Sequence, residues 1–235
     1  MKAARKRAQA IAKGRGRDAR VIVPLAFEVA ARISARPLDA FRNDPTQLTN
    51  ALTELHGAIR ADGIVVALAA GMERAAGAGA DAAAMAARGP VAASLEACRR
   101  LRQTLGDDAA LVAGLTGPAA LARELAVDAQ AAGACFTALV KAFCDAGADV
   151  VLVIDDAGAG ADAAWQATVK TADNIARFHQ ACLLGLDDGS LPTPVRQPLD
   201  APAPDGLGFI MTNAPVPADA DIETLRRWVA RARGE

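Results

Sequence analysis

The chain has 235 residues, of which 52% are hydrophobic but only 3% are aromatic and none is tyrosine, so a sizeable core must be built from aliphatic side chains. The formal net charge of −1 creates no overall field that would attract nucleic acid or a membrane surface. No apolar run approaches the roughly 20 residues of a membrane helix, and Arg outnumbers Lys 21 to 5, which is typical of a GC-rich bacterial coding bias.

Residues 1–20 form a basic N-terminal segment. It carries eight Lys and Arg side chains against one acidic residue, Asp18. An export signal would follow such a start with an apolar stretch, whereas here more charge follows, so we expect a cytoplasmic protein. The segment is interpreted as a solvated and partly frayed first helix, with binding to an acidic partner as the alternative.

The rest of the chain alternates short apolar runs with longer helical patterns. Six strands are predicted, at 21–25, 63–69, 110–115, 149–154, 181–186 and 208–212. Helices are predicted at 44–60, starting with Asp44 and Pro45, and at 90–106, 118–146 with a break near Gly133, 163–180 and 219–233. The Ala/Gly-rich segment 69–89 is predicted to be a mobile loop with some helix, and the Pro-rich segment 187–207 a loop.

This order of elements predicts the α/β class. Strands that are apolar throughout and separated by helices indicate a parallel sheet covered on both faces. The choice lies between a TIM-type (β/α) barrel and an open doubly wound sheet. Six strands are predicted where a complete barrel needs eight, so the pattern alone leaves this choice open, and the length suits a single domain, 1–235.

Four cysteines, Cys98, Cys135, Cys144 and Cys182, show no C-x-x-C spacing. We therefore interpret them as reduced core residues.

Four stretches of the sequence resemble the uroporphyrinogen decarboxylase-like superfamily, which includes the porphyrinogen decarboxylase, corrinoid-dependent methyltransferases and cobalamin-independent methionine synthase. They are RPLDAFRNDPTQLTNALTELHGAIRADGIVVA (36–67), ALVAGLTGPAALARELA (110–126), AFCDAGADVVLVIDDAGAG (142–160) and GLGFIMTNAPVPADADIETLRRWVARAR (206–233). The resemblance implies a (β/α) barrel and either decarboxylation or methyl transfer on a tetrapyrrole, a corrinoid or a small molecule. Members of the superfamily usually carry two further strand–helix units where this chain has residues 185–207, so the resemblance implies a TIM-type (β/α) barrel that is abridged or incomplete.

The decarboxylase branch of the superfamily uses an Arg-rich segment after the first strand, an aspartate after the second, a tyrosine, and a histidine after the last. Here the first strand is followed only by Glu28 and Arg32, and no aspartate precedes Glu73 after the second strand. The chain has no tyrosine, and its last strand ends MTNAPV, without a histidine. The resemblance therefore does not extend to the residues of uroporphyrinogen decarboxylation.

The methyltransferase branch binds zinc through a His-x-Cys after a middle strand and a Cys after the last, and the zinc activates a thiol. Neither the fifth nor the last predicted strand ends on such a ligand, and Cys182 lies at the start of its strand. His179 is three residues before Cys182 but lacks a visible third ligand, so a structural role is favoured. His56, among polar neighbours, is interpreted as a surface residue.

Asp155 and Asp156 end the fourth apolar run. Adjacent residues of a strand point to opposite sides, so one carboxylate is expected to line a site while the other caps a helix or accepts backbone N–H groups. The following GAGADA (158–163) matches a G-x-G-x-x-A dinucleotide pattern, but its acidic neighbours would repel a pyrophosphate, and low-complexity Ala/Gly explains it better. Asp187 and Asp188 are interpreted as a turn whose carboxylates can reach the mouth of the fold.

Two hypotheses of function follow. The first is an enzyme for decarboxylation or methyl transfer on a small-molecule substrate, with candidate catalytic residues Asp155, Asp156 and Glu73, and candidate substrate-binding residues Thr116, Asn213, Asp187 and Arg32. The cofactor stays open between none, a divalent metal ion and a corrinoid. The second is a catalytically degenerate barrel that acts as a binding or accessory subunit of a partner protein. In both, the strand edges exposed by an incomplete barrel predict a homodimer.

Overall fold

The computed structural model describes every residue except 1–2, 17, 69–70, 187–189 and 203–205. Its strands are β1 (Arg20–Val23), β2 (Gly63–Ala67), β3 (Ala110–Thr116), β4 (Val150–Ile154), β5 (Cys182–Gly185), β6 (Val195–Gln197) and β7 (Gly208–Thr212). Its helices are α1 (Ala4–Ala12), α2 (Phe27–Ile33), α3 (Leu38–Arg42), α4 (Pro45–Ile59), α5 (Met72–Ala75), α6 (Ala82–Ala86), α7 (Gly89–Leu105), α8 (Pro118–Leu125), α9 (Ala129–Asp145), α10 (Ala163–Phe178) and α11 (Ile222–Arg233), with a 3-10 turn at Ala159–Ala161.

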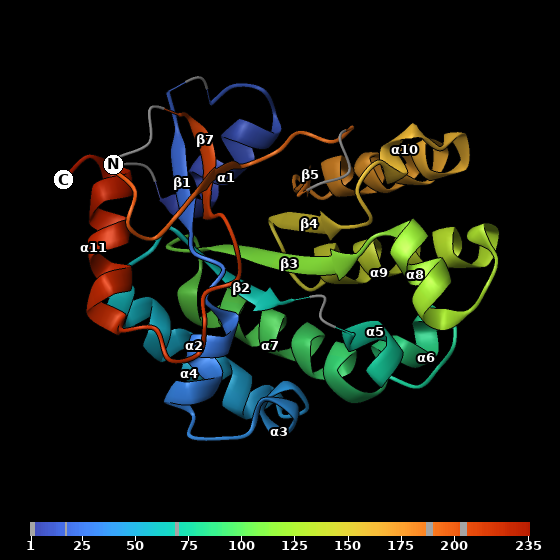
Figure 1. Ribbon diagram of the computed structural model, residues 1–235, viewed down its shortest axis with the longest axis horizontal. Coiled ribbons are helices and arrows are strands. Elements are labelled where there is room, and N and C mark those ends of the chain that lie inside the picture. Colours follow the sequence, from blue (N-terminus) through green and yellow to red (C-terminus); the bar gives the residue numbers. More distant parts are fainter. Residues whose placement is uncertain (1–2, 17, 69–70, 187–189, 203–205) are drawn as a thin grey trace.

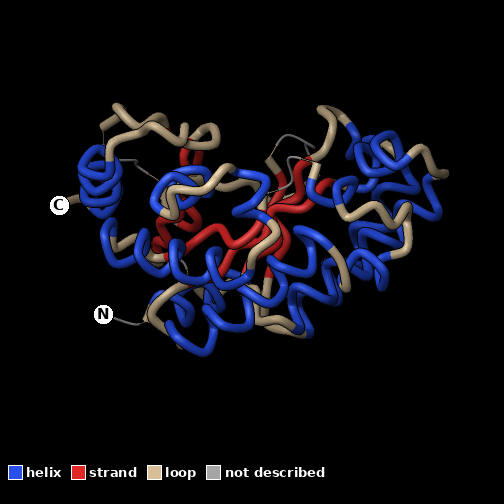
Figure 2. The backbone as a smooth tube through the Cα atoms, turned by 90° about the horizontal axis from the view of Figure 1, so that it is seen from below, coloured by secondary structure: helices blue, strands red, loops and turns tan. Residues whose placement is uncertain are grey.

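The strands form two sheets in which every pairing is parallel. One sheet has the order β1-β7-β6 and the other β2-β3-β4-β5. Backbone hydrogen bonds link the two sheets at two places. Near β1 and β2, Asp62 N donates to Ile22 O at 3.0 Å. Between β5 and β6, Gly185 N at the end of β5 donates to Pro192 O at 3.0 Å, just before β6. Figures 1 and 2 show the strands at the centre of the molecule with helices packed beside them. The predicted α/β class with parallel sheets is confirmed.

One strand differs from the sequence-based prediction. The Pro-rich segment was expected to be a loop, but it contains β6, which pairs with β7 from Val195↔Ile210 to Gln197↔Thr212. This strand has only three residues, one of them a half-buried Val and one an exposed Arg, so it carries no recognisable apolar run. Its pairing with β7 therefore supplies the seventh strand that the sequence pattern does not reveal.

The helix starts follow the predicted capping chemistry. Asp44 caps α4 by accepting hydrogen bonds from Thr46 N at 2.9 Å and Gln47 N at 3.1 Å, and Pro45 is the first helical residue, as predicted. The predicted break near Gly133 is wrong: α8 ends at Ala126 in the left-handed conformation, and Gly133 lies inside α9. A Cβ at Gly133 would meet Thr168 Oγ1 at 2.7 Å, so the glycine allows α10 to pack closely on α9.

The helical part of the prediction for segment 69–89 is confirmed. The segment 69–89 holds α5 and α6, and Met72 and Met85 from these helices are buried in the core. On α10, Trp165 and Val169 are buried, whereas Phe178 at its end is 84% exposed.

The basic N-terminal segment is not a solvated helix. Ala4 and Ala8 of α1 are buried. Arg5 Nε lies 3.0 Å from Asp149 Oδ1, and Arg7 Nη2 lies 2.6 Å from Asp62 Oδ1, and both carboxylates are almost fully buried. The ion pairs of Arg5 and Arg7 therefore hold α1 against the amino-terminal ends of β4 and β2.

Cys98, Cys135 and Cys144 are buried and Cys182 is half-buried, and all four are free thiols, as predicted. Burial raises the pKa of Cys98, Cys144 and Cys182 to about 12 and that of Cys135 to about 11. These thiols are therefore protonated core residues.

Among the described residues, no single helix has the length and apolar character to cross a bilayer. Helices α8 and α9 pass that test only when taken together, and they are bent by 116° where they join.

Candidate functional site

A pocket of about 430 Å³ opens where the carboxyl ends of the strands come together. Each of the seven strands that the structure describes contributes a residue that lies within the strand or no more than two positions beyond its end: Leu25 (β1), Leu68 (β2), Thr116 (β3), Ile154 (β4), Leu186 (β5), Arg196 (β6) and Asn213 (β7). Ala120, Arg123 and Glu124 of α8, together with Asp155, Asp156, Ala214 and Pro215, complete the lining. The size is that of a small-molecule site.

Thr116 connects this pocket with a buried carboxyl group. Glu73, on α5 after β2, is fully buried and accepts hydrogen bonds from Thr116 N at 3.0 Å and from Thr116 Oγ1 at 2.8 Å. Burial raises the pKa of Glu73 above its ordinary value, the two hydrogen bonds from Thr116 oppose this rise, and the charge of Glu124 adds to it. The predicted candidates Glu73 and Thr116 are thus in direct contact, with Thr116 facing the pocket.

The raised pKa of Glu73 makes a pH-dependent contribution to stability. A carboxyl with a higher pKa in the folded state binds more protons there than in the unfolded chain, so stability falls as the pH rises from about 4.5 through the folded-state pKa. Glu73→Gln keeps an acceptor for Thr116 N and removes this titration. We therefore expect wild type to lose stability relative to Glu73→Gln with rising pH, measured by urea unfolding across the acidic to neutral range. Parallel pH profiles for the two proteins would contradict the assignment.

Asp155 holds the local structure together. Its carboxylate accepts hydrogen bonds from Ala119 N at 3.1 Å, Ala120 N at 2.7 Å, Asp156 N at 2.9 Å and Trp165 Nε1 at 2.6 Å. It therefore caps α8 from a neighbouring strand and ties α10 to the same point. The expectation that one of the two aspartates binds backbone N–H groups is confirmed, although the helix it caps is α8, while α10 has its own cap, Asp162.

Gly117 is the residue that makes this capping possible. A Cβ at that position would come 2.2 Å from Asp155 Oδ2 and 2.4 Å from its Cγ. Only glycine lets the carboxylate lie against the first turn of α8.

Asp156 lies at the rim of the pocket and forms an ion pair with Arg123 of α8. The side chain of Asp156 is 48% exposed and that of Arg123 is 62% exposed. The two aspartates thus have separate partners. Both lie beyond the end of β4 and both line the pocket, so the expected alternation of strand side chains does not place only one of them at the site.

Arg196 and Asn213 complete the mouth. Arg196 donates to the carbonyl oxygens of Leu186, at 3.4 Å, and of Asn213. The predicted candidate Asn213 lines the pocket, and its backbone N–H bonds Gln197 O at 3.0 Å. Sequence reasoning missed Arg196 because its segment reads as a loop.

Two other candidates are not part of the described site. Arg32, on α2, donates from Nη2 to Ala220 O at 2.8 Å, so it holds the turn before α11, and it is not among the pocket-lining residues. Asp187 lies outside the residues that the structure describes.

Glu124 is a site residue that sequence reasoning missed. It lies on α8 and lines the pocket, and its Oε2 is buried without a hydrogen-bond partner. A signal was available, because Glu124 follows the buried Ala120 and Leu121 by four and three residues and so shares their helix face. A carboxylate on the buried face of a helix is uncommon and marks a candidate site.

The donor atoms around the pocket do not suit zinc. No Cys or His is among its lining residues, and no group of three His, Cys, Asp or Glu in the described part of the chain is arranged to hold a metal ion. His179 Nε2 lies 3.5 Å from Asp145 Oδ1, which gives it a structural partner. His56 was expected at the surface but is half-buried, and burial lowers its pKa.

No model of a known protein family matches the sequence, and no curated protein matches it either. A solved structure described as a methyltransferase from Methanosarcina mazei is similar in fold, with a TM-score of 0.74 over 100% of this chain and 99% of that chain. The sequence identity is 14%, so the similarity is one of fold.

Proposed function

We propose that this chain is a small-molecule methyltransferase on an abridged (β/α) barrel of the uroporphyrinogen decarboxylase-like type. The observation that carries the proposal is the pocket lined from the carboxyl ends of the seven described strands, in which the lining residue Thr116 is hydrogen-bonded to the buried Glu73. Active sites of (β/α) barrels lie at that end of the strands. The fold similarity to a methyltransferase along the whole chain supports methyl transfer over decarboxylation.

The Thr116–Glu73 pair suits the proton movement that methyl transfer requires. The bond from the methyl carbon to its donor breaks and a bond to the acceptor forms, while the acceptor loses a proton or the leaving group gains one. Thr116 lines the pocket and its hydroxyl is hydrogen-bonded to Glu73, so this pair offers a route for a proton between the substrate and the buried carboxyl group. Thr116 is the group in reach of the substrate, and Glu73 is a positioning residue behind it.

The methyl carrier is proposed as a second substrate at the mouth of the pocket. A volume of about 430 Å³ suits a small molecule, whereas a corrinoid or tetrapyrrole macrocycle would lie across the opening. Arg123 and Arg196 are exposed there, and a carboxylate or phosphate group of such a carrier would exchange with their present contacts, which are Asp156 for Arg123 and backbone carbonyls for Arg196. The homodimer and the cytoplasmic location stay predictions from the sequence.

The proposal is tested by incubating the protein with methylcobalamin and a panel of thiol and amine acceptors. We expect a protein-dependent loss of the methylcobalamin absorbance, with the methylated acceptor identified by mass spectrometry. Thr116→Val should slow transfer by about tenfold or more, whereas Thr53→Val, which loses a comparable hydroxyl on α4, should leave the rate unchanged. Glu73→Gln should change the pH profile of the rate, which a purely structural role would not do.

The accessory-subunit hypothesis is the second candidate. The observation that favours it is that the Asp155 carboxylate already accepts four hydrogen bonds, which leaves this candidate catalytic residue little capacity for catalysis. It predicts no transfer with any acceptor and a stoichiometric protein partner in material purified from the natural host. That outcome would overturn the methyltransferase proposal.

A further inference from the structure

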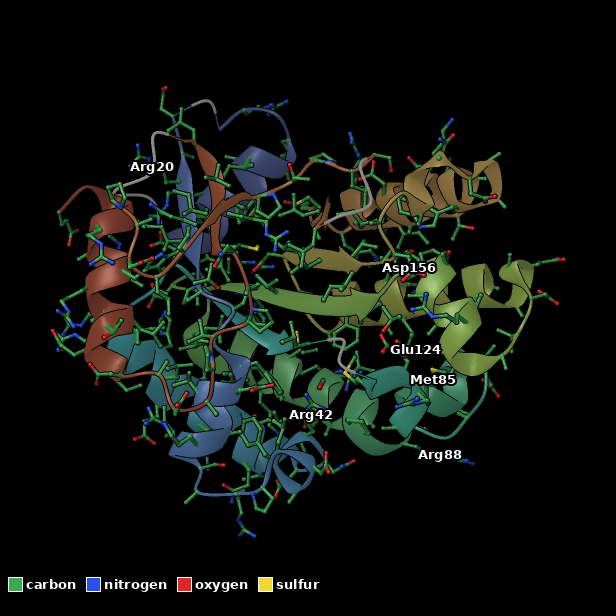
Figure 3. The ribbon with its side chains drawn as sticks, viewed as in Figure 1. Arg20, Arg42, Met85, Arg88, Glu124 and Asp156 are labelled. Carbon is green, nitrogen blue, oxygen red and sulfur yellow. The ribbon has the colours of Figure 1, made fainter. Side chains whose placement is uncertain are left out.

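The carboxylate of Glu124 is the one acidic group of the pocket for which the described structure shows neither a hydrogen bond nor an ion pair. Glu73 is bonded to Thr116, Asp155 to four donors, and Asp156 to Arg123. By contrast, Glu124 Oε2 is shielded from solvent and accepts no hydrogen bond. Figure 3 labels Glu124, a residue of α8, in the right half of the view, and α8 is in contact with α5, which carries Glu73.

A buried carboxylate oxygen without a donor is costly. Leaving a charged group unsatisfied costs more than the roughly 1–3 kcal/mol of a neutral one, and the nearby carboxyl of Glu73 adds repulsion. A ligand that brings a positively charged donor would remove both penalties. A turn of the carboxylate about its Cγ–Cδ bond presents either oxygen to the pocket, so the shielded oxygen does not prevent such contact.

The residues that line the pocket limit which class of cation could bind at Glu124. Four large apolar residues, Leu25, Leu68, Ile154 and Leu186, are among the lining residues and offer a surface for the apolar body of a ligand. No aromatic side chain lines it, so the described site offers no aromatic cage for a quaternary ammonium group. A metal ion would need three or more ligands, and no such group exists among the described residues.

We propose that Glu124 binds an aliphatic ammonium group that carries at least one N–H, so that the substrate of this pocket is a protonated amine with an apolar body. This inference rests on the proposed function, since it assigns the substrate class of the same pocket. The cations at the mouth do not oppose it, because Arg123 is neutralised by Asp156 and Arg196 is directed to backbone carbonyls. The ammonium group lies inward at Glu124, and the aliphatic body contacts the apolar walls.

Calorimetric titration with two matched probes tests the inference. N,N-dimethylbutylammonium has one N–H at neutral pH, and butyltrimethylammonium has the same charge and a similar apolar body but none. We expect the first to bind wild type at least about tenfold more tightly than the second. Glu124→Gln should weaken the first probe by about tenfold or more, and Glu54→Gln, which removes an exposed charge on α4, should not change it.

Equal binding of the two probes to wild type would overturn the inference, and this comparison uses no variant. Unchanged binding of the first probe to Glu124→Gln would also overturn it. The same preparations are assayed with methylcobalamin. Ammonium binding without methyl transfer would support this inference and overturn the proposed function. Methyl transfer without ammonium binding would overturn this inference alone.

Discussion

Replacing Asp149 with asparagine is expected to destabilise the protein by about 3–5 kcal/mol, the range found when one partner of a buried ion pair is removed. Asp149 is the residue just before β4, and its side chain is 2% exposed. Its carboxylate pairs with Arg5 of α1 and Arg102 of α7 and accepts a hydrogen bond from Leu111 N at 3.0 Å. An asparagine amide would leave at least one of the two guanidinium groups without its anion.

Asp107→Asn is the matched control. Asp107 also pairs with Arg5, at 3.4 Å, but its side chain is 40% exposed, so water replaces the lost contact. Urea unfolding monitored by circular dichroism gives both free energies. If the free energy of unfolding fell by similar amounts in the two variants, the conclusion that buried ion pairs hold α1 in place would be wrong.

Asp155→Ala is expected to cost about 2–4 kcal/mol, because it removes a helix cap and leaves further donors without an acceptor. Ala119 N and Ala120 N lose the group that caps α8, and Trp165 Nε1 loses its 2.6 Å partner. The fluorescence of Trp165 should shift toward that of exposed tryptophan if α10 loosens. The second tryptophan, Trp228, lies on α11, where its indole donates to Pro198 O, and provides an internal reference.

Asp156→Ala is the control for that experiment, since it removes the neighbouring carboxylate and only its exposed partner Arg123 is affected. We expect near wild-type stability. A stability loss at Asp156 equal to that at Asp155 would contradict the separate roles assigned to the two aspartates.

Much of the fold follows from patterns that are local in the sequence. The strand around Val151 and the helix begun by Asp44 and Pro45 are fixed by apolar runs and capping chemistry, which short stretches encode fully. Strand β6 could not be predicted in this way, because its three residues become a strand only through pairing with β7. The placement of α1 likewise depends on Asp62 and Asp149, which are distant in sequence.

The candidate site was predictable where it follows strand ends. Thr116 and Asn213 were identified because carboxyl ends of parallel strands meet at one edge, and both line the pocket. The contact between Glu73 and Thr116 spans 43 residues and needs the fold. Sequence reasoning overlooked Glu124, a carboxylate on the buried face of a helix. It also assigned Arg32, a cation after β1, to the site, whereas the Arg32 side chain is hydrogen-bonded to Ala220 O outside the pocket.

Native mass spectrometry of the protein purified from its own host, beside an Ala214→Trp variant purified in parallel, tests the central claim most directly. Ala214 is exposed at the lining of the pocket, so the indole fills the opening with little effect on the core. If the pocket at the strand ends is a small-molecule site, wild type should carry a bound small molecule, and the variant should lose it. The same bound mass in both proteins, or a protein partner and no small molecule in either, would contradict the account.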